Sequence, residues 1–95
     1  MIERHVTFEV LPDKTDEFEK FFSEHYRPAM SRMPGFVKVE LLREQNAPLR
    51  YQMVIRFQTA DDAAGWRASP EHQGLSPQIK TLYSGSELKV YDVLG

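Results

Sequence analysis

Apolar and polar side chains alternate at the start of the chain, with the period of two that is typical of a half-buried β-strand. Residues 2–10, IERHVTFEV, show this alternation most clearly. Three further segments combine β-branched, leucine and aromatic side chains between turn-forming residues. They predict strands at residues 36–43, 50–58 and 87–94, so four strands are expected.

The apolar spacing changes to three and four residues over residues 15–33, which predicts an amphipathic helix. Pro28 should kink or end this helix, because a proline ring clashes with the carbonyl group four residues back. A second helical region is expected over residues 59–83. Pro70 suits the first turn of a helix, so this region should divide there, with Ser69 as the N-cap of its second helix.

The resulting order, β-α-β-β-α-β, most simply gives a ferredoxin-like α+β fold, a four-stranded antiparallel sheet with two helices on one face. Residues 1–95 should form one domain, since so short a chain cannot enclose a second core. The last three strands carry apolar residues on both sides, which predicts an apolar face on the open side of the sheet. Two such faces are expected to pack together in a homodimer with two-fold symmetry.

Composition and charge exclude several classes of protein. With 41% hydrophobic and 27% charged residues, the chain is typical of a globular protein. A net charge of −2 leaves no basic surface for nucleic acid. No apolar run approaches the roughly 20 residues that span a bilayer. There is no cysteine, and the three histidines fall on three separate elements, so no metal site is expected. These features predict a soluble, cytoplasmic protein without a membrane partner.

Two motifs narrow the function. The first is MPGF at residues 33–36, and the second, FQTADDAAGWRASPEH, runs from Phe57 to His72. Together they resemble the antibiotic biosynthesis monooxygenase domain family, whose members carry a strand ending in an aromatic residue, a short helix with a tryptophan, and then a serine and a histidine. The resemblance covers nearly the whole chain. It implies a dimeric α+β barrel that oxidises a quinol or polycyclic phenol with O₂ and without a cofactor.

Such chemistry needs a base, a partner for negative charge and a dry pocket, because the substrate itself must supply electrons to O₂. His72 and His25 are the candidate bases, since an unperturbed imidazole titrates at about pH 6.5. Arg56, Arg67 or Arg4 would stabilise an oxyanion. The aromatic side chains expected to bind the small aromatic substrate are Trp66, Phe8, Phe22, Tyr51 and Phe57.

The same residues also suit structural roles. Trp66 would equally fill the core between helices and sheet, and His72 would equally bond to the backbone or lie at a dimer rim. Two other functions suit an imidazole in an apolar pocket. One is a non-catalytic, stress-associated protein that holds a small ligand, and the other is a lactone or enol isomerase on the same fold. Uptake of O₂ distinguishes a monooxygenase from both.

Overall fold

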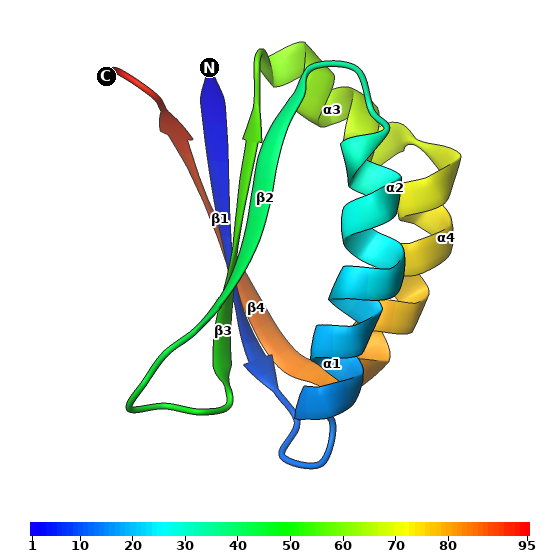
Figure 1. Ribbon diagram of the computed structural model, residues 1–95, viewed down its shortest axis with the longest axis vertical. Helices are drawn as coiled ribbons and strands as arrows, with labels where there is room; N and C mark the ends of the chain where they lie inside the picture. Colours follow the sequence, from blue (N-terminus) through cyan, green and yellow to red (C-terminus); the bar gives the residue numbers. More distant parts are fainter.

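The computed structural model describes residues 1–95 and shows a four-stranded antiparallel sheet with helices on one face (Figure 1). The α+β, ferredoxin-like fold class is thereby confirmed. None of the helices has the length and apolar composition needed to cross a bilayer. In chain order the elements are β1 (Ile2–Val10), α1 (Thr15–Phe21), a π-helical turn (Phe22–Tyr26), α2 (Arg27–Ser31), β2 (Phe36–Arg43), β3 (Arg50–Phe57), α3 (Ala60–Ala68), α4 (Pro70–Ile79), a 3₁₀ turn (Lys80–Leu82) and β4 (Tyr83–Asp92).

The core lies between the sheet and the helices. The strands are ordered β2-β3-β1-β4, and in the ladder between the two central strands Phe8 lies opposite Tyr51 and Val6 opposite Met53. These side chains share one face, because alternate residues of a strand point the same way. Phe18 of α1 packs on them, with its ring centroid 5.2 Å from those of both Phe8 and Tyr51.

The first helical segment does not end at Pro28 but continues to Ser31 (Figure 1). Directly before the proline, the helix widens into the π turn Phe22–Tyr26. In a regular α-helix the proline ring would clash with the carbonyl of Glu24, four residues back. The wider turn changes this spacing, and Pro28 falls in the first turn of α2, where its missing N–H costs no hydrogen bond.

The second helical region divides at Ser69, as expected. The backbone N–H of His72 donates a hydrogen bond to Ser69 Oγ at 3.1 Å, which caps α4. The region ends earlier than predicted, because β4 begins at Tyr83 instead of at residue 87. The Tyr83 ring packs on Phe8, with 4.9 Å between centroids, and pairing with β1 draws the Ser-Gly-Ser segment into the strand.

The open face of the sheet is mainly polar, so the prediction of an apolar face was wrong. On β2, a register shift between Phe36 and Lys38 explains the difference. It lets Phe36, Val39 and Leu41 all pair with helix-facing residues of β3, which leaves charged side chains of β2 on the open side. By strand pairing, the open face carries Glu3, His5, Thr7, Glu9, Lys38, Glu40, Leu42, Arg50, Gln52, Val54, Arg56, Gly85, Glu87, Lys89 and Tyr91.

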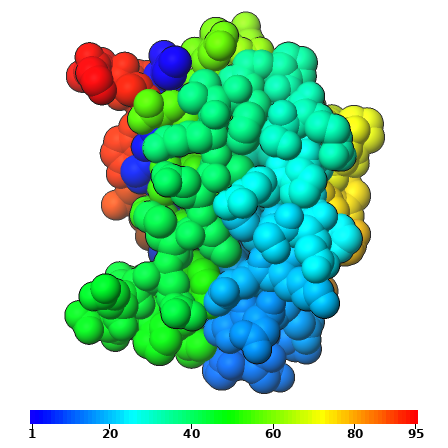
Figure 2. All heavy atoms as spheres, viewed as in Figure 1, coloured from blue at the N-terminus to red at the C-terminus, as the bar shows by residue number.

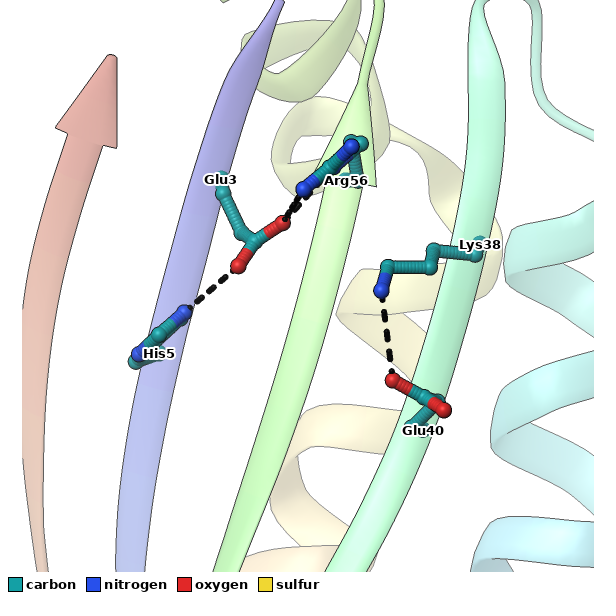
Figure 3. Close-up of polar contacts among 5 residues, drawn as sticks. All are labelled: Glu3, His5, Lys38, Glu40 and Arg56. Atoms are coloured by element: carbon teal, nitrogen blue, oxygen red, sulfur yellow. Dashed lines mark hydrogen bonds and ion pairs between the residues drawn. The ribbon is translucent and has the colours of Figure 1, made fainter. Parts of the chain in front are cut away.

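Charges on the open face are paired within the chain (Figure 3). Arg56 Nε donates to Glu3 Oε2 at 2.7 Å, and the other oxygen of Glu3 lies 2.8 Å from His5 Nε2. The Glu3 carboxyl group has its pKa lowered, first by its hydrogen bond to His5. On β2, Lys38 Nζ donates to Glu40 Oε1 at 3.3 Å. The face is thus a network of opposite charges.

Gly35 is the one residue with a positive φ, 76°, and it turns the chain from α2 into β2. A Cβ atom there would overlap the carboxylate of Asp62. We expect Gly35→Ala to lower the free energy of unfolding by about 1–3 kcal/mol, from backbone strain alone. For a domain of this size, each kcal/mol lowers Tm by about 4–8 °C in a thermal melt.

Gly74→Ala is the matched control, because Gly74 lies inside α4 with no atom near an added Cβ. Alanine should raise stability there by about 0.5–1 kcal/mol. Equal values of Tm for Gly35→Ala and the wild-type protein would contradict the expected backbone strain at this position.

Candidate functional site

A cavity of about 170 Å³ lies between the sheet and helices α3 and α4. It is enclosed by the helix-facing side chains of β1, β3 and β4, together with the π turn of the first helical segment. No carboxylate is among the residues that line it. These residues are Arg4, Val6, Phe8, Tyr26, Met53, Ile55, Trp66, Arg67, His72, Ser76, Ile79, Tyr83, Ser86 and Leu88.

Three rings meet in one wall of this cavity. Trp66 is 2% exposed, and its ring lies edge-on to Tyr26, with 5.4 Å between centroids. The imidazole of His72 is 5.1 Å from Trp66 and 6.3 Å from Tyr26, centroid to centroid. Trp66 therefore fills the core and lines the cavity at once.

Ser69 is what brings Trp66 and His72 together across the break between α3 and α4. Its buried Oγ donates to the backbone carbonyl of Trp66 at 2.7 Å and accepts from the backbone N–H of His72 at 3.1 Å. Pro70 supplies the first residue of α4, so His72 falls within the opening turn. The Ser-Pro corner thereby turns both rings toward the same cavity.

The electrostatic environment keeps the imidazole neutral. Burial of His72 lowers its pKa from 6.5, and the positive charges of Arg67, Arg4 and Lys80 lower it further. At neutral pH the ring is therefore unprotonated and able to accept a proton. Burial raises the pKa of Tyr26 to about 12, so this hydroxyl group stays protonated.

Two arginines complete the polar part of the cavity. Arg4 projects from β1 on the helix-facing side of the sheet, where it is half-buried, and Arg67 is exposed on α3 at the rim. Burial lowers the pKa of Arg4, and the neighbouring charge of Arg67 lowers it further. The cavity thus combines an apolar, aromatic wall with a neutral base and two positive charges.

Of the residues predicted for the site, His72, Trp66 and Phe8 line this cavity together. His25 does not, because it lies on the outer surface of the π turn, exposed beside Phe21. Arg56 is on the opposite face of the sheet, paired with Glu3.

The other predicted aromatic residues also lie elsewhere. Phe22 and Tyr51 border a separate groove between the first helix and the β2–β3 loop. This loop stands out from the body of the molecule (Figure 2). The hydroxyl group of Tyr51 donates to Glu19 Oε2 at 2.5 Å. Phe57 is 0% exposed and packs against Phe36 in the core.

Tyr26 is the member of the three-ring wall that the sequence interpretation did not propose for the site. It follows Phe18 and Phe22 at intervals of four, so helical spacing marks it as buried. Spacing alone did not show which part of the core it would reach, because the π turn changes the phase of the helix. The structure arranges no three His, Asp or Glu side chains as metal ligands.

The sequence profile described as "Antibiotic biosynthesis monooxygenase" matches residues 1–76, a range that contains Trp66 and His72. No curated protein matches the chain.

Solved structures share the fold over nearly the whole chain. SnoaB, described as a cofactor-independent oxygenase from Streptomyces nogalater, superposes with a TM-score of 0.88 at 23% identity, covering 99% of this chain and 93% of that one. Rv0793 from Mycobacterium tuberculosis gives a TM-score of 0.86 at 14% identity, covering 99% and 95%. A conserved protein from Methanosarcina mazei Go1 gives 0.87 at 15% identity, covering 95% and 89%. At such identities the likeness shows the fold alone.

Proposed function

The chain belongs to the antibiotic biosynthesis monooxygenase family, and we propose that it oxidises an electron-rich aromatic molecule, a quinol or polycyclic phenol, with O₂ and without a cofactor. One observation carries this proposal. A neutral imidazole, His72, lines an aromatic cavity that contains two arginines and no carboxylate. These are the parts needed to make a phenol into an electron donor.

The physical requirement comes from O₂, whose triplet ground state reacts slowly with closed-shell molecules. A phenolate is a far better one-electron donor than a phenol, so removing the proton is the step that the protein can promote. His72 would act as the base, and Arg4 and Arg67 would stabilise the developing oxyanion. The buried rings of Trp66 and Tyr26 would exclude water from this part of the cavity.

In the proposed reaction, His72 takes the hydroxyl proton of the phenol. The phenolate gives one electron to O₂, and the resulting ring radical and superoxide combine through a new carbon–oxygen bond. His72 returns its proton to the peroxide formed in this way, and loss of the proton on that carbon with cleavage of the O–O bond then releases the outer oxygen as water. Phenol and O₂ thereby become quinone and water, with the substrate supplying all the electrons.

The proposal includes a homodimer that packs through the sheet faces, with residues 1–95 as one domain in each protomer. The open face is uncovered in the single chain, and Leu42 and Tyr91 are 47% and 45% exposed on it. Because its charges already pair within the chain, covering them would cost less than burying isolated ions. Light scattering during size-exclusion chromatography should give twice the chain mass, and a monomer at micromolar concentration would contradict this.

Oxygen consumption tests the function directly. Reduced quinones and anthrols should give O₂ uptake that depends on the protein, with a quinone product that carries one oxygen atom from ¹⁸O₂. Conversion at an unchanged rate under nitrogen would replace the monooxygenase with an isomerase. Binding without conversion would indicate a ligand-holding protein.

The pH profile should follow His72. Because its pKa in the folded protein lies below 6.5, kcat/KM for O₂ uptake should be level around neutral pH and fall in acid, by about tenfold per pH unit once below that pKa. A profile that instead rises between about pH 7 and about pH 9 would contradict a base with a lowered pKa.

The free energy of unfolding should also fall as the pH is lowered. Between the lowered pKa and 6.5, the unfolded chain binds more protons at this position than the folded chain does. His72 therefore destabilises the fold as pH falls through this window, and makes no contribution above it. The difference in unfolding free energy between wild type and His72→Gln, measured across that window, isolates the effect from the other titrating groups.

A further inference from the structure

We infer that the cavity takes a ligand with a fixed negative charge, such as a carboxylate, attached to a single aromatic ring. This inference rests on the proposed function only in taking the ligand to be aromatic. It follows from the two arginines of the cavity, from the absence of any acidic partner, and from the size of the space.

Arg4 and Arg67 are unpaired, unlike most other arginines of the chain. Arg43, Arg50 and Arg56 each form an ion pair with a glutamate. Neither cavity arginine makes an ion pair or a side-chain hydrogen bond with another residue, and no carboxylate lines the space between them. Their hydrogen-bond donors are available to a ligand.

The positions of Arg4 and Arg67 at the same cavity have an electrostatic cost. Arg4 is half-buried, and like charges repel more strongly where water is partly excluded. Consistent with this, burial and the nearby charge of Arg67 both lower the pKa of Arg4. An anion placed between the two guanidinium groups would remove this repulsion and form charge-assisted hydrogen bonds.

The charges that line the cavity favour an anionic ligand over a neutral phenol. The empty cavity holds two positive charges, because His72 is neutral. Transfer of a proton from the phenol to His72 does not change the net charge of the cavity with its ligand, so a net charge of two would remain. A ligand that arrives with one negative charge lowers this net positive charge from two to one, both before and after the proton moves to His72.

The size of the cavity favours a ligand with one ring. A cavity of about 150 Å³ in another protein is known to hold benzene. The space of about 170 Å³ here therefore encloses one ring with a small substituent. A polycyclic molecule would have to leave part of its surface outside.

Benzoate and benzamide form a matched pair of probes, equal in shape and different in charge. Trp66 is the only tryptophan and lines the cavity, so its fluorescence reports binding. We expect benzoate to bind at least about tenfold more tightly than benzamide, since hydrogen bonds to a charged group are roughly twice as strong as neutral ones. Anthracene-2-carboxylate should bind more weakly than benzoate.

Arg4→Gln and Arg67→Gln should each remove most of the preference for benzoate. Arg67 is exposed, so its variant should fold normally even if Arg4→Gln does not. Arg32→Gln is the control: it removes the same charge from an exposed position that does not line the cavity. It should leave the preference unchanged.

Three results would overturn the inference: equal binding of benzoate and benzamide, a preference that survives Arg67→Gln, or tighter binding of the three-ring acid. The proposed function is separable from these outcomes. Oxidation of neutral phenols without a preference for benzoate would defeat only this inference. A strong preference for benzoate without O₂ uptake by any phenol would defeat only the monooxygenase.

Discussion

Replacing His72 with glutamine should lower the rate of O₂ consumption at saturating substrate by about 10²–10⁴-fold, the usual contribution of a general base. Glutamine has a similar size and can form hydrogen bonds, but it does not accept a proton at neutral pH. The capping bond of α4 uses the backbone N–H at this position, so the substitution leaves it intact. Oxygen-electrode kinetics with the best phenolic substrate would measure the loss.

His25→Gln is the matched control, since it changes the same chemical group at an exposed position outside the cavity. Its rate should equal that of the wild type. Binding of benzoate should survive in both variants, because the proposed anion site is formed by Arg4 and Arg67. If His72→Gln kept more than about a tenth of the activity, the base would be another group or the solvent.

Replacing Phe57 with alanine should lower the free energy of unfolding by about 3–5 kcal/mol, as for other large aromatic side chains removed from a core. Phe57 is 0% exposed, and its ring lies 6.0 Å from that of Phe36. Domains of this size are stable by only about 5–15 kcal/mol, so the variant should be close to unfolding at room temperature. Denaturation in urea, followed by circular dichroism, would measure the change.

Two comparisons separate a core role from a ligand-binding role for Phe57. Phe57→Leu should cost less than Phe57→Ala, because most of the volume is kept, and it should retain benzoate binding. Leu94→Ala removes an apolar side chain that is 95% exposed, and its effect should stay within about 0.5 kcal/mol. A Phe57→Ala variant that was stable but no longer bound benzoate would place this residue in the site instead.

Local chemistry explains what could be predicted from the sequence. The break at Ser69 and Pro70 was predictable because the cap involves only residues a few positions apart. The start of β4 was not, because the flexible Ser-Gly-Ser segment becomes a strand through pairing with the distant β1. The polar sheet face was missed for a similar reason: one irregular position near Val37 reverses which residues of β2 face the helices.

The site was predicted in part for equally physical reasons. Phe57 and Arg56 are neighbours on a strand, so their side chains must point to opposite faces and could not both line one cavity. Applying the alternation of β3 strictly would have excluded that pair. The motif left open whether Trp66 and His72 share one face, and the structure brings them together because Ser69 binds the backbone of both. Tyr26 required knowledge of the π turn.

That π turn, Phe22–Tyr26, sets the rotational phase between the two halves of the first helical segment. Each residue of an α-helix turns the chain by about 100°, whereas the π turn winds about one more residue into its single turn, so winding the same five residues as a regular α-helix would rotate α1 against α2 by roughly that angle. With Tyr26 held at the cavity wall, Phe18 would swing out of the core, and with Phe18 held in the core, Tyr26 would leave the cavity. The extra width of one turn is therefore what allows a single helical segment to serve the core at one end and the cavity at the other.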